Sequence, residues 1–150
     1  MLVPAALVVY FSVLAAAGTA GAGQAPPVQP PAGGDPSFER EFARASALLA
    51  KNPSAALKAF TKLQQTRPGT CLECLLGIAA AHNRTEQYID AERTARKVLE
   101  LTDLPDAELI AYNLLGVSFY DRTPLDGSAA LLEQNMTQAE AAFREAHQLD

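Results

Sequence analysis

The only two cysteines of the chain, Cys71 and Cys74, lie three residues apart and are the residues best suited to chemistry. They follow Pro68 and Gly69 and open a stretch with helical periodicity, where Thr70 is in position to cap the first turn. On the first turn of a helix, two residues three positions apart are close enough to form a disulfide. We therefore predict a Cys71–Cys74 disulfide that acts as a local structural staple.

The same pair supports one alternative chemistry, which is thiol–disulfide exchange. A thiol at the N-terminus of a helix has a lowered pKa, because the backbone N–H groups there favour the thiolate. Thiol oxidoreductases use this spacing, but the thioredoxin-like arrangement also needs surrounding strands, and the sequence shows no strand pattern. A thiol–disulfide redox partner that uses Cys71 and Cys74 is therefore the alternative function.

No other group of residues indicates catalysis, a metal or a cofactor. A closed zinc site needs four ligands, and beyond the cysteines only His82 and His147 are available. His82 falls on the helix face that meets its neighbour, where packing is the simpler role. Motifs of serine hydrolases, zinc proteases, dinucleotide-binding proteins and phosphate-binding loops are missing. We expect no metal site, no cofactor and no enzymatic activity.

Composition predicts one soluble helical domain that does not bind nucleic acid. The chain has 150 residues, of which 17 are acidic and 12 basic, and its net charge is −5. Binding to phosphates draws its affinity from clustered Lys and Arg, so this balance disfavours DNA or RNA as a partner. Alanine is abundant, and its high helix propensity and small side chain favour closely packed helices.

The first 22 residues predict a secretory signal peptide. Residues 2–17 carry no charge and form a near-continuous apolar run, which small residues at positions 18–22 follow. The run is shorter than the roughly 20 residues that a membrane-spanning helix needs. We expect export to the periplasm or the extracellular space, with no stable membrane span after the signal peptide is cleaved. An N-terminal membrane anchor is the alternative.

Residues 23–36 are rich in proline and glycine, which predicts an extended linker without a core of its own. The folded domain is therefore expected over residues 37–150. Its clearest part is a pair of amphipathic helices separated by the polar residues 83–87, and so short a link makes the two helices antiparallel. The apolar face of the first helix comprises Leu75, Ile78, Ala79 and His82, and that of the second comprises Ala91, Ala95, Val98 and Leu101.

The pattern recurs on both sides of this pair. In the preceding copy the first helix carries Phe42, Ala45 and Leu49, and the second carries Ala56, Phe60 and Leu63. In the following copy the corresponding sets are Tyr112, Leu115, Gly116 and Phe119, and Ala139, Phe143, Ala146 and Leu149.

These positions resemble the tetratricopeptide repeat (TPR) family, whose unit of about 34 residues pairs two helices with small residues where they cross. Ala79 and Ala91 stand twelve residues apart at the two crossing positions, and Tyr88 is the aromatic residue that opens the second helix. Ala56 and Ala91 are 35 residues apart, close to the family period. The resemblance implies an all-α fold of tandem antiparallel helical hairpins, a TPR-like α-solenoid. About three repeats are expected, at residues 37–70, 71–105 and 106–150.

First helices of successive TPR hairpins line a concave groove that holds a peptide or a helix. Carried over by position, the resemblance implies groove positions for Asn83, Arg84, Asn113, Val117 and Tyr120. The asparagines would bond a peptide backbone and Arg84 would supply one charge contact, with ordinary exposed polarity as the alternative role for each. We therefore expect an exported, bacterial scaffold for protein–protein interaction, whose protein or peptide partner the sequence does not identify.

The last copy departs from the family by an eleven-residue insertion between its two helices. Within it, Ser128 is in position to cap a lengthened second helix, and Leu132, Met136, Ala139 and Phe143 continue one stripe. Leu131 and Leu132 would then extend beyond the hairpin and suit a partner contact.

No further helix follows this hairpin to cover its apolar face. We therefore expect a fragment of a longer array, or self-association through the uncapped C-terminal hairpin. An N-terminal binding segment of a larger exported enzyme is a further alternative.

Two sequence triplets, Asn83-Arg84-Thr85 and Asn135-Met136-Thr137, match the N-glycosylation pattern. Both are predicted to lie in loops, where an asparagine is accessible. The pattern matters only in a host that glycosylates exported proteins.

Overall fold

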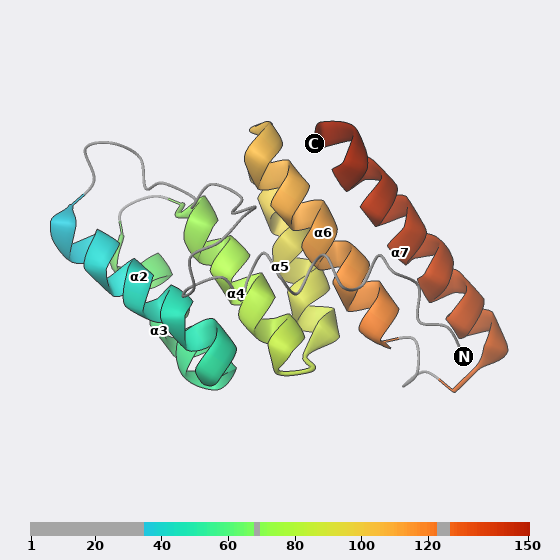
Figure 1. The fold of residues 1–150 in the computed structure, drawn as a ribbon, viewed down its shortest axis with the longest axis horizontal. Coiled ribbons are helices and arrows are strands. Elements are labelled where there is room, and N and C mark those ends of the chain that lie inside the picture. The colour runs from blue at the N-terminus through green and yellow to red at the C-terminus, as the bar shows by residue number, and fades with distance from the viewer. Residues whose placement is uncertain (1–34, 68–69, 123–126) are drawn as a thin grey trace, which may run out of the picture.

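The computed structural model describes residues 35–67, 70–122 and 127–150, and the regular elements in these ranges are all α-helices. Six helices pack in chain order as adjacent antiparallel pairs (Figure 1). The predicted signal peptide, residues 1–22, and most of the predicted linker lie outside the described residues. The helices are α2 (Pro36–Lys51), α3 (Pro53–Thr66), α4 (Leu72–Arg84), α5 (Tyr88–Leu101), α6 (Pro105–Arg122) and α7 (Ala129–Leu149).

Helices α2 and α3 both begin with a capping side chain followed by proline. The Asp35 carboxylate accepts a hydrogen bond from the backbone N–H of Ser37 at 2.9 Å, and the Asn52 amide oxygen accepts one from Ala55 at 3.1 Å. Proline suits the first helical position, where no N–H partner is lost. The first described helix therefore begins at Pro36, the last residue of the predicted linker. The predicted core positions Ala45, Leu49, Ala56, Phe60 and Leu63 are buried as expected.

Helices α4 and α5 form the pair that the sequence predicted most clearly. Ala79 and Ala91, the two predicted crossing residues, are fully buried. Two boundaries differ from expectation. Cys71, not Thr70, caps α4, and the helix continues through Arg84, so that only residues 85–87 form the turn. The turn contains Glu86 at a φ of 61°, a left-handed conformation that reverses the chain in three residues.

Helices α6 and α7 are the longest pair, with 18 and 21 residues. Ser128 stands at the N-cap position of α7, as predicted, but its side chain makes no capping hydrogen bond, and α7 begins at Ala129. The predicted stripe on α7 is wrong in part. Of its members only Ala139 is buried, while Leu132, Met136 and Phe143 are 37–46% exposed. The buried stripe instead comprises Asn135, Ala139, Ala142 and Ala146.

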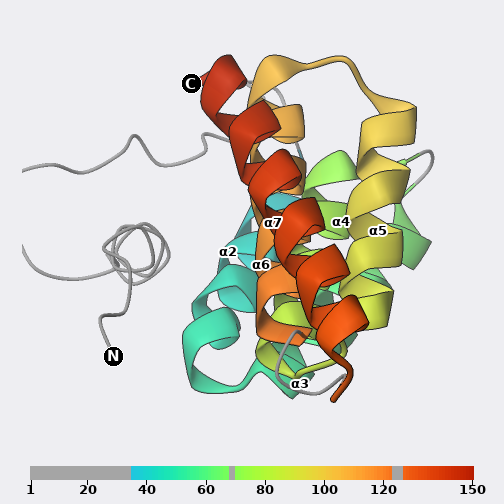
Figure 2. The same cartoon turned by 90° about the vertical axis from the view of Figure 1, so that its right-hand side faces the viewer.

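The helices form a row in which α2, α4 and α6 lie on one side (Figures 1 and 2). Besides the contacts between helices consecutive in the chain, α2 contacts α4 and α4 contacts α6. No contact of that extent joins α3 to α5 or α5 to α7. Helices α2, α4 and α6, called the first layer below, are thus packed more closely to one another than α3, α5 and α7 are.

None of the six described helices is both long and apolar enough to cross a membrane.

Candidate functional site

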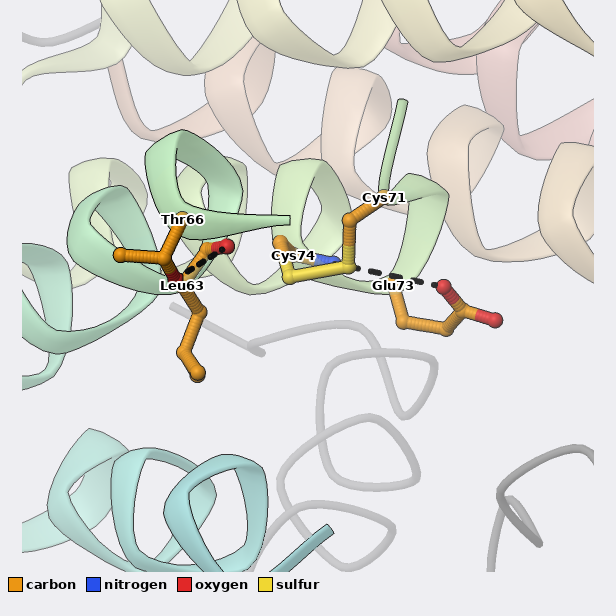
Figure 3. Close-up of a disulfide and its surroundings, with 5 residues drawn as sticks. All are labelled: Leu63, Thr66, Cys71, Glu73 and Cys74. Carbon is orange, nitrogen blue, oxygen red and sulfur yellow. Dashed lines mark hydrogen bonds between the residues drawn. A yellow bond between two sulfur atoms is a disulfide. The ribbon is translucent and has the colours of Figure 1, made fainter. Parts of the chain in front are cut away.

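The two cysteines form a disulfide at the start of α4 (Figure 3). The prediction of this pairing is confirmed. Cys71 precedes the first helical residue, and its sulfur also accepts a hydrogen bond from the backbone N–H of Cys74 at 3.2 Å. Glu73 Oε2 lies 3.7 Å from the Cys71 sulfur, a polar contact only, because a disulfide sulfur has no proton to donate. The bridge therefore closes the first turn of α4 and takes the place of an ordinary side-chain cap.

The disulfide is buried rather than presented to solvent. Cys71 is 2% exposed and Cys74 is fully buried, and both belong to the hydrophobic core together with Leu63 of α3. Thiol–disulfide exchange needs direct attack of a thiolate on one of the sulfurs. A reactant can reach these sulfurs only after α3 and α4 separate locally, so the geometry favours the structural role over the redox role.

Asn83 serves as a polar link between α4 and α6. Its amide nitrogen donates to the Leu114 carbonyl at 3.0 Å, and its amide oxygen accepts from the Ser118 hydroxyl at 2.8 Å. Asn83 is 9% exposed and Ser118 is 1% exposed. The predicted groove role of Asn83 does not fit this geometry, because both polar atoms of its side chain are occupied within the fold. Its chemistry instead sets the register of two first-layer helices.

The other predicted groove residues are partly exposed on the first layer. Arg84 ends α4, whereas Asn113, Val117 and Tyr120 lie on α6 at spacings of four and three residues, which places them on one side of that helix. The Asn113 amide nitrogen donates to the Leu109 carbonyl of its own helix at 3.0 Å. That hydrogen bond does not involve the amide oxygen of Asn113, which can accept a hydrogen bond.

Leu131 and Leu132, predicted to extend beyond the hairpin, are 43% and 46% exposed near the start of α7. Leu131 and Leu132 lie four and three residues before Asn135, which is one helical turn earlier. They therefore stand on either side of the line that the buried residues follow along α7. Asn135 is 2% exposed. The packing of α7 therefore changes within one turn from buried to exposed, and it leaves both leucines accessible.

A polar cluster at the end of α6 was not predicted from the sequence. The Arg122 guanidinium lies 3.2 Å from Glu92 Oε2 of α5 and donates to Asn135 Oδ1 of α7 at 2.9 Å. Glu92 also pairs with Arg96 at 2.9 Å. The cluster ties α5, α6 and α7 together by charge-assisted hydrogen bonds. Glu92, Arg122 and Asn135 are 13 to 43 residues apart, so no local pattern in the sequence marks their contacts.

Two acidic groups beside this cluster are poorly solvated. Burial raises the pKa of the Asp121 carboxyl above its ordinary value. The pKa of Tyr88 is raised by burial, and further by the negative charges of Asp121 and Glu86.

The two glycosylation triplets do not lie in loops, which corrects the prediction. Asn83 lies within α4 and Asn135 within α7, and both side chains are buried and hydrogen-bonded to neighbouring helices. Polar residues at these positions suggested loops, but each fills a position on the buried stripe of its helix. Neither asparagine is accessible for modification in the folded chain.

Among the described residues, no group of histidine, cysteine and acidic side chains is arranged to hold a metal ion. Two hollows lie on the first helical pair, between α2 and α3. Comparison with models of protein families, with curated proteins and with solved structures finds no match to this chain.

Proposed function

We propose that the chain is a TPR-like scaffold that binds another protein or a peptide on its first layer. The observation that carries the proposal is the asymmetry of packing, in which α4 contacts both α2 and α6, whereas no contact of that extent joins α3 to α5 or α5 to α7. A row of helical pairs that is closer on one side bends toward that side, as α-solenoids do. The surface of α4 and α6 would then line the inner side of the bend.

Details of the middle pair support the TPR assignment. Small residues stand where α4 and α5 pack, and each second helix contacts the first helix of the next pair, α3 with α4 and α5 with α6. Asn113, Val117 and Tyr120 provide an amide, an apolar side chain and a phenol on the inner side. These groups suit the backbone and side chains of an extended peptide.

Site-specific photo-crosslinking in the native host tests the proposal. A photoreactive residue at Asn113 or Val117 should give a discrete adduct with a second protein. The matched control position is Arg93 on α5, whose side chain is 75% exposed and which lies outside the first layer. Adducts that are the same from Arg93, or that are missing from both α6 positions, would argue against binding on the first layer.

We further propose that the protein is exported, on the strength of the apolar residues 2–17. N-terminal sequencing of the protein recovered from its native compartment tests this. A start near residue 22 supports cleavage of a signal peptide, whereas an intact Met1 in the cytoplasm contradicts export.

A further inference from the structure

Two faces at opposite ends of the row of helices have no neighbour among the described helices. The first lies between α2 and α3, where a hollow of about 170 Å³ has an apolar floor and a charged rim. A second hollow of about 580 Å³ continues it and shares Glu41, Lys62 and Leu63. The floor of the first hollow comprises Ala45, Leu48, Ala59 and Leu63, and the rim comprises Glu41, Arg44 and Lys62.

The second face lies on α7, at the other end of the row (Figures 1 and 2). Leu132 and Met136 on this helix are 46% and 43% exposed. Four residues apart, they lie on one side of the helix, and Glu140 follows four residues after Met136. They form an exposed apolar ridge, defined by these two residues, whereas Phe143 further along packs its ring against Gly116 of α6.

The two ends carry opposite charge. Residues 35–67, which form the first pair, contain six basic and three acidic residues, a net charge of +3. Residues 127–150, which contain α7, have one basic and four acidic residues, a net charge of −3. An α7 surface is therefore attracted to the α2–α3 surface and repelled by a second α7 surface.

We infer that the chain self-associates head to tail, with the apolar ridge of one copy seated in the α2–α3 hollow of the next. The contact would repeat the packing within the chain, where α3 covers α4 and α5 covers α6. In the same way α7 of one copy covers α2 of the following copy. Because the two surfaces differ, each added copy leaves one ridge and one hollow free, so the association is open-ended.

Sedimentation velocity of the full chain over a range of concentrations tests the inference. The wild-type protein should form a series of oligomers that grows with concentration and shrinks as salt is added. Leu132→Glu on the ridge and Lys62→Glu on the rim should each weaken association about tenfold or more. The matched controls are Leu104→Glu, at a leucine 58% exposed between α5 and α6, and Lys97→Glu on α5, and neither should weaken it.

Mixing the two interface variants gives the sharpest result. The Lys62→Glu copy keeps an intact ridge and the Leu132→Glu copy keeps an intact hollow, so one wild-type junction can form between them. An equimolar mixture should give a 1:1 complex although neither variant associates strongly alone.

Four outcomes would overturn the inference. They are a wild-type chain that stays monomeric at all concentrations, association that neither variant weakens, a closed dimer that only Leu132→Glu disrupts, and a mixture that forms no 1:1 complex. The third would indicate a symmetric contact between two α7 helices, and the first would indicate that each end is covered within one copy. None of these outcomes bears on peptide binding by the first layer.

Discussion

Two glycines in the first layer each face a phenylalanine ring. A Cβ atom on Gly77 would lie 2.7 Å from ring atoms of Phe60, and one on Gly116 would lie 2.5 Å from the ring of Phe143. The neighbours differ in freedom, because Phe60 is 1% exposed and Phe143 is 37% exposed. A buried ring has nowhere to move, whereas a ring at the surface can rotate outward.

This difference predicts unequal effects of the same substitution. Overpacking costs about 1–3 kcal/mol, against a gain of about 1 kcal/mol when alanine replaces a glycine within a helix. Gly77→Ala should therefore lower the free energy of unfolding, measured in urea, while Gly116→Ala should leave it unchanged or raise it. A second substitution, Phe60→Leu, should reduce the cost of Gly77→Ala. Equal losses at the two glycines would contradict the role assigned to burial of the ring.

The Asn83 link predicts a stability effect at a residue that the sequence assigned to binding. Asn83→Ala removes both hydrogen bonds to α6, and loss of a buried hydrogen-bonding group costs about 1–3 kcal/mol. Asn113→Ala is the matched control, because its hydrogen bond to Leu109 stays within α6 and the site is partly exposed. We expect the control to change stability by about 0.5 kcal/mol or less. Chemical denaturation distinguishes the two, and a similar loss for both would refute the linking role.

Asp121 predicts a pH dependence. Because burial raises its pKa, the folded protein binds a proton at this carboxyl more tightly than the unfolded chain does. The unfavourable charge is present at neutral pH and is relieved as the pH falls through the raised pKa. Asp121→Asn should therefore be more stable than the wild type at pH 7, and the difference should vanish below the ordinary pKa of 3.8.

The stabilities of the wild type and of Asp121→Asn must be compared at each pH, because Asp35 has the opposite effect on how stability changes with pH. Hydrogen bonds from the backbone and then the side chain of Ser37 lower its pKa, so its contribution is lost as the pH falls. This contribution is common to both proteins and cancels in the difference. A difference in stability that does not change between pH 7 and pH 3 would show that Asp121 is not poorly solvated.

At the scale of the element, the disulfide is expected to make a modest contribution to stability that is local to the start of α4. Closing so short a loop removes little entropy from the unfolded chain, about 2 kcal/mol by the chain-entropy relation. The free energy of unfolding, measured by thermal or urea denaturation, should be higher by about this amount for the oxidised protein than for the Cys71→Ser/Cys74→Ser double variant. Hydrogen exchange should be faster in the variant at the start of α4, and unchanged exchange there would contradict the capping role.

The same burial predicts slow reduction. A dithiol reductant should reduce the bridge at a rate limited by local opening of α3 and α4, and sub-denaturing urea should accelerate it. The released thiols can be counted by alkylation and mass spectrometry. Fast reduction in native buffer would favour the exchange function that the burial now disfavours.

The helices themselves were largely predictable, because their apolar positions recur every three or four residues and their starts carry Asp–Pro and Asn–Pro signals. The cysteine pairing was predictable from its spacing. Which face of each helix is buried was less predictable. On α7, alanines and an asparagine make up the buried stripe while leucine, methionine and phenylalanine remain outside, so hydrophobicity alone selected the wrong face. Close packing against α6 explains this, because small side chains let the two backbones approach.

At the scale of the whole molecule, long-range pairings were beyond the reach of sequence patterns. Asn83 and Ser118 are 35 residues apart, and Arg122 meets Glu92 and Asn135 from two other helices. Each residue looks like an ordinary polar surface residue until the helices are placed. The layer arrangement that supports the binding proposal depends on these contacts, so the candidate site was only partly visible in the sequence.

The opposite charges at the two ends give the molecule an electric dipole moment along the row of helices. A protein of net charge −5 would ordinarily bind only an anion exchanger near neutral pH. A polarised molecule can also turn its basic end, α2 and α3, toward an acidic surface. Its orientation on a charged surface, such as a lipid headgroup layer or a chromatography resin, would then be fixed by this moment rather than by its net charge.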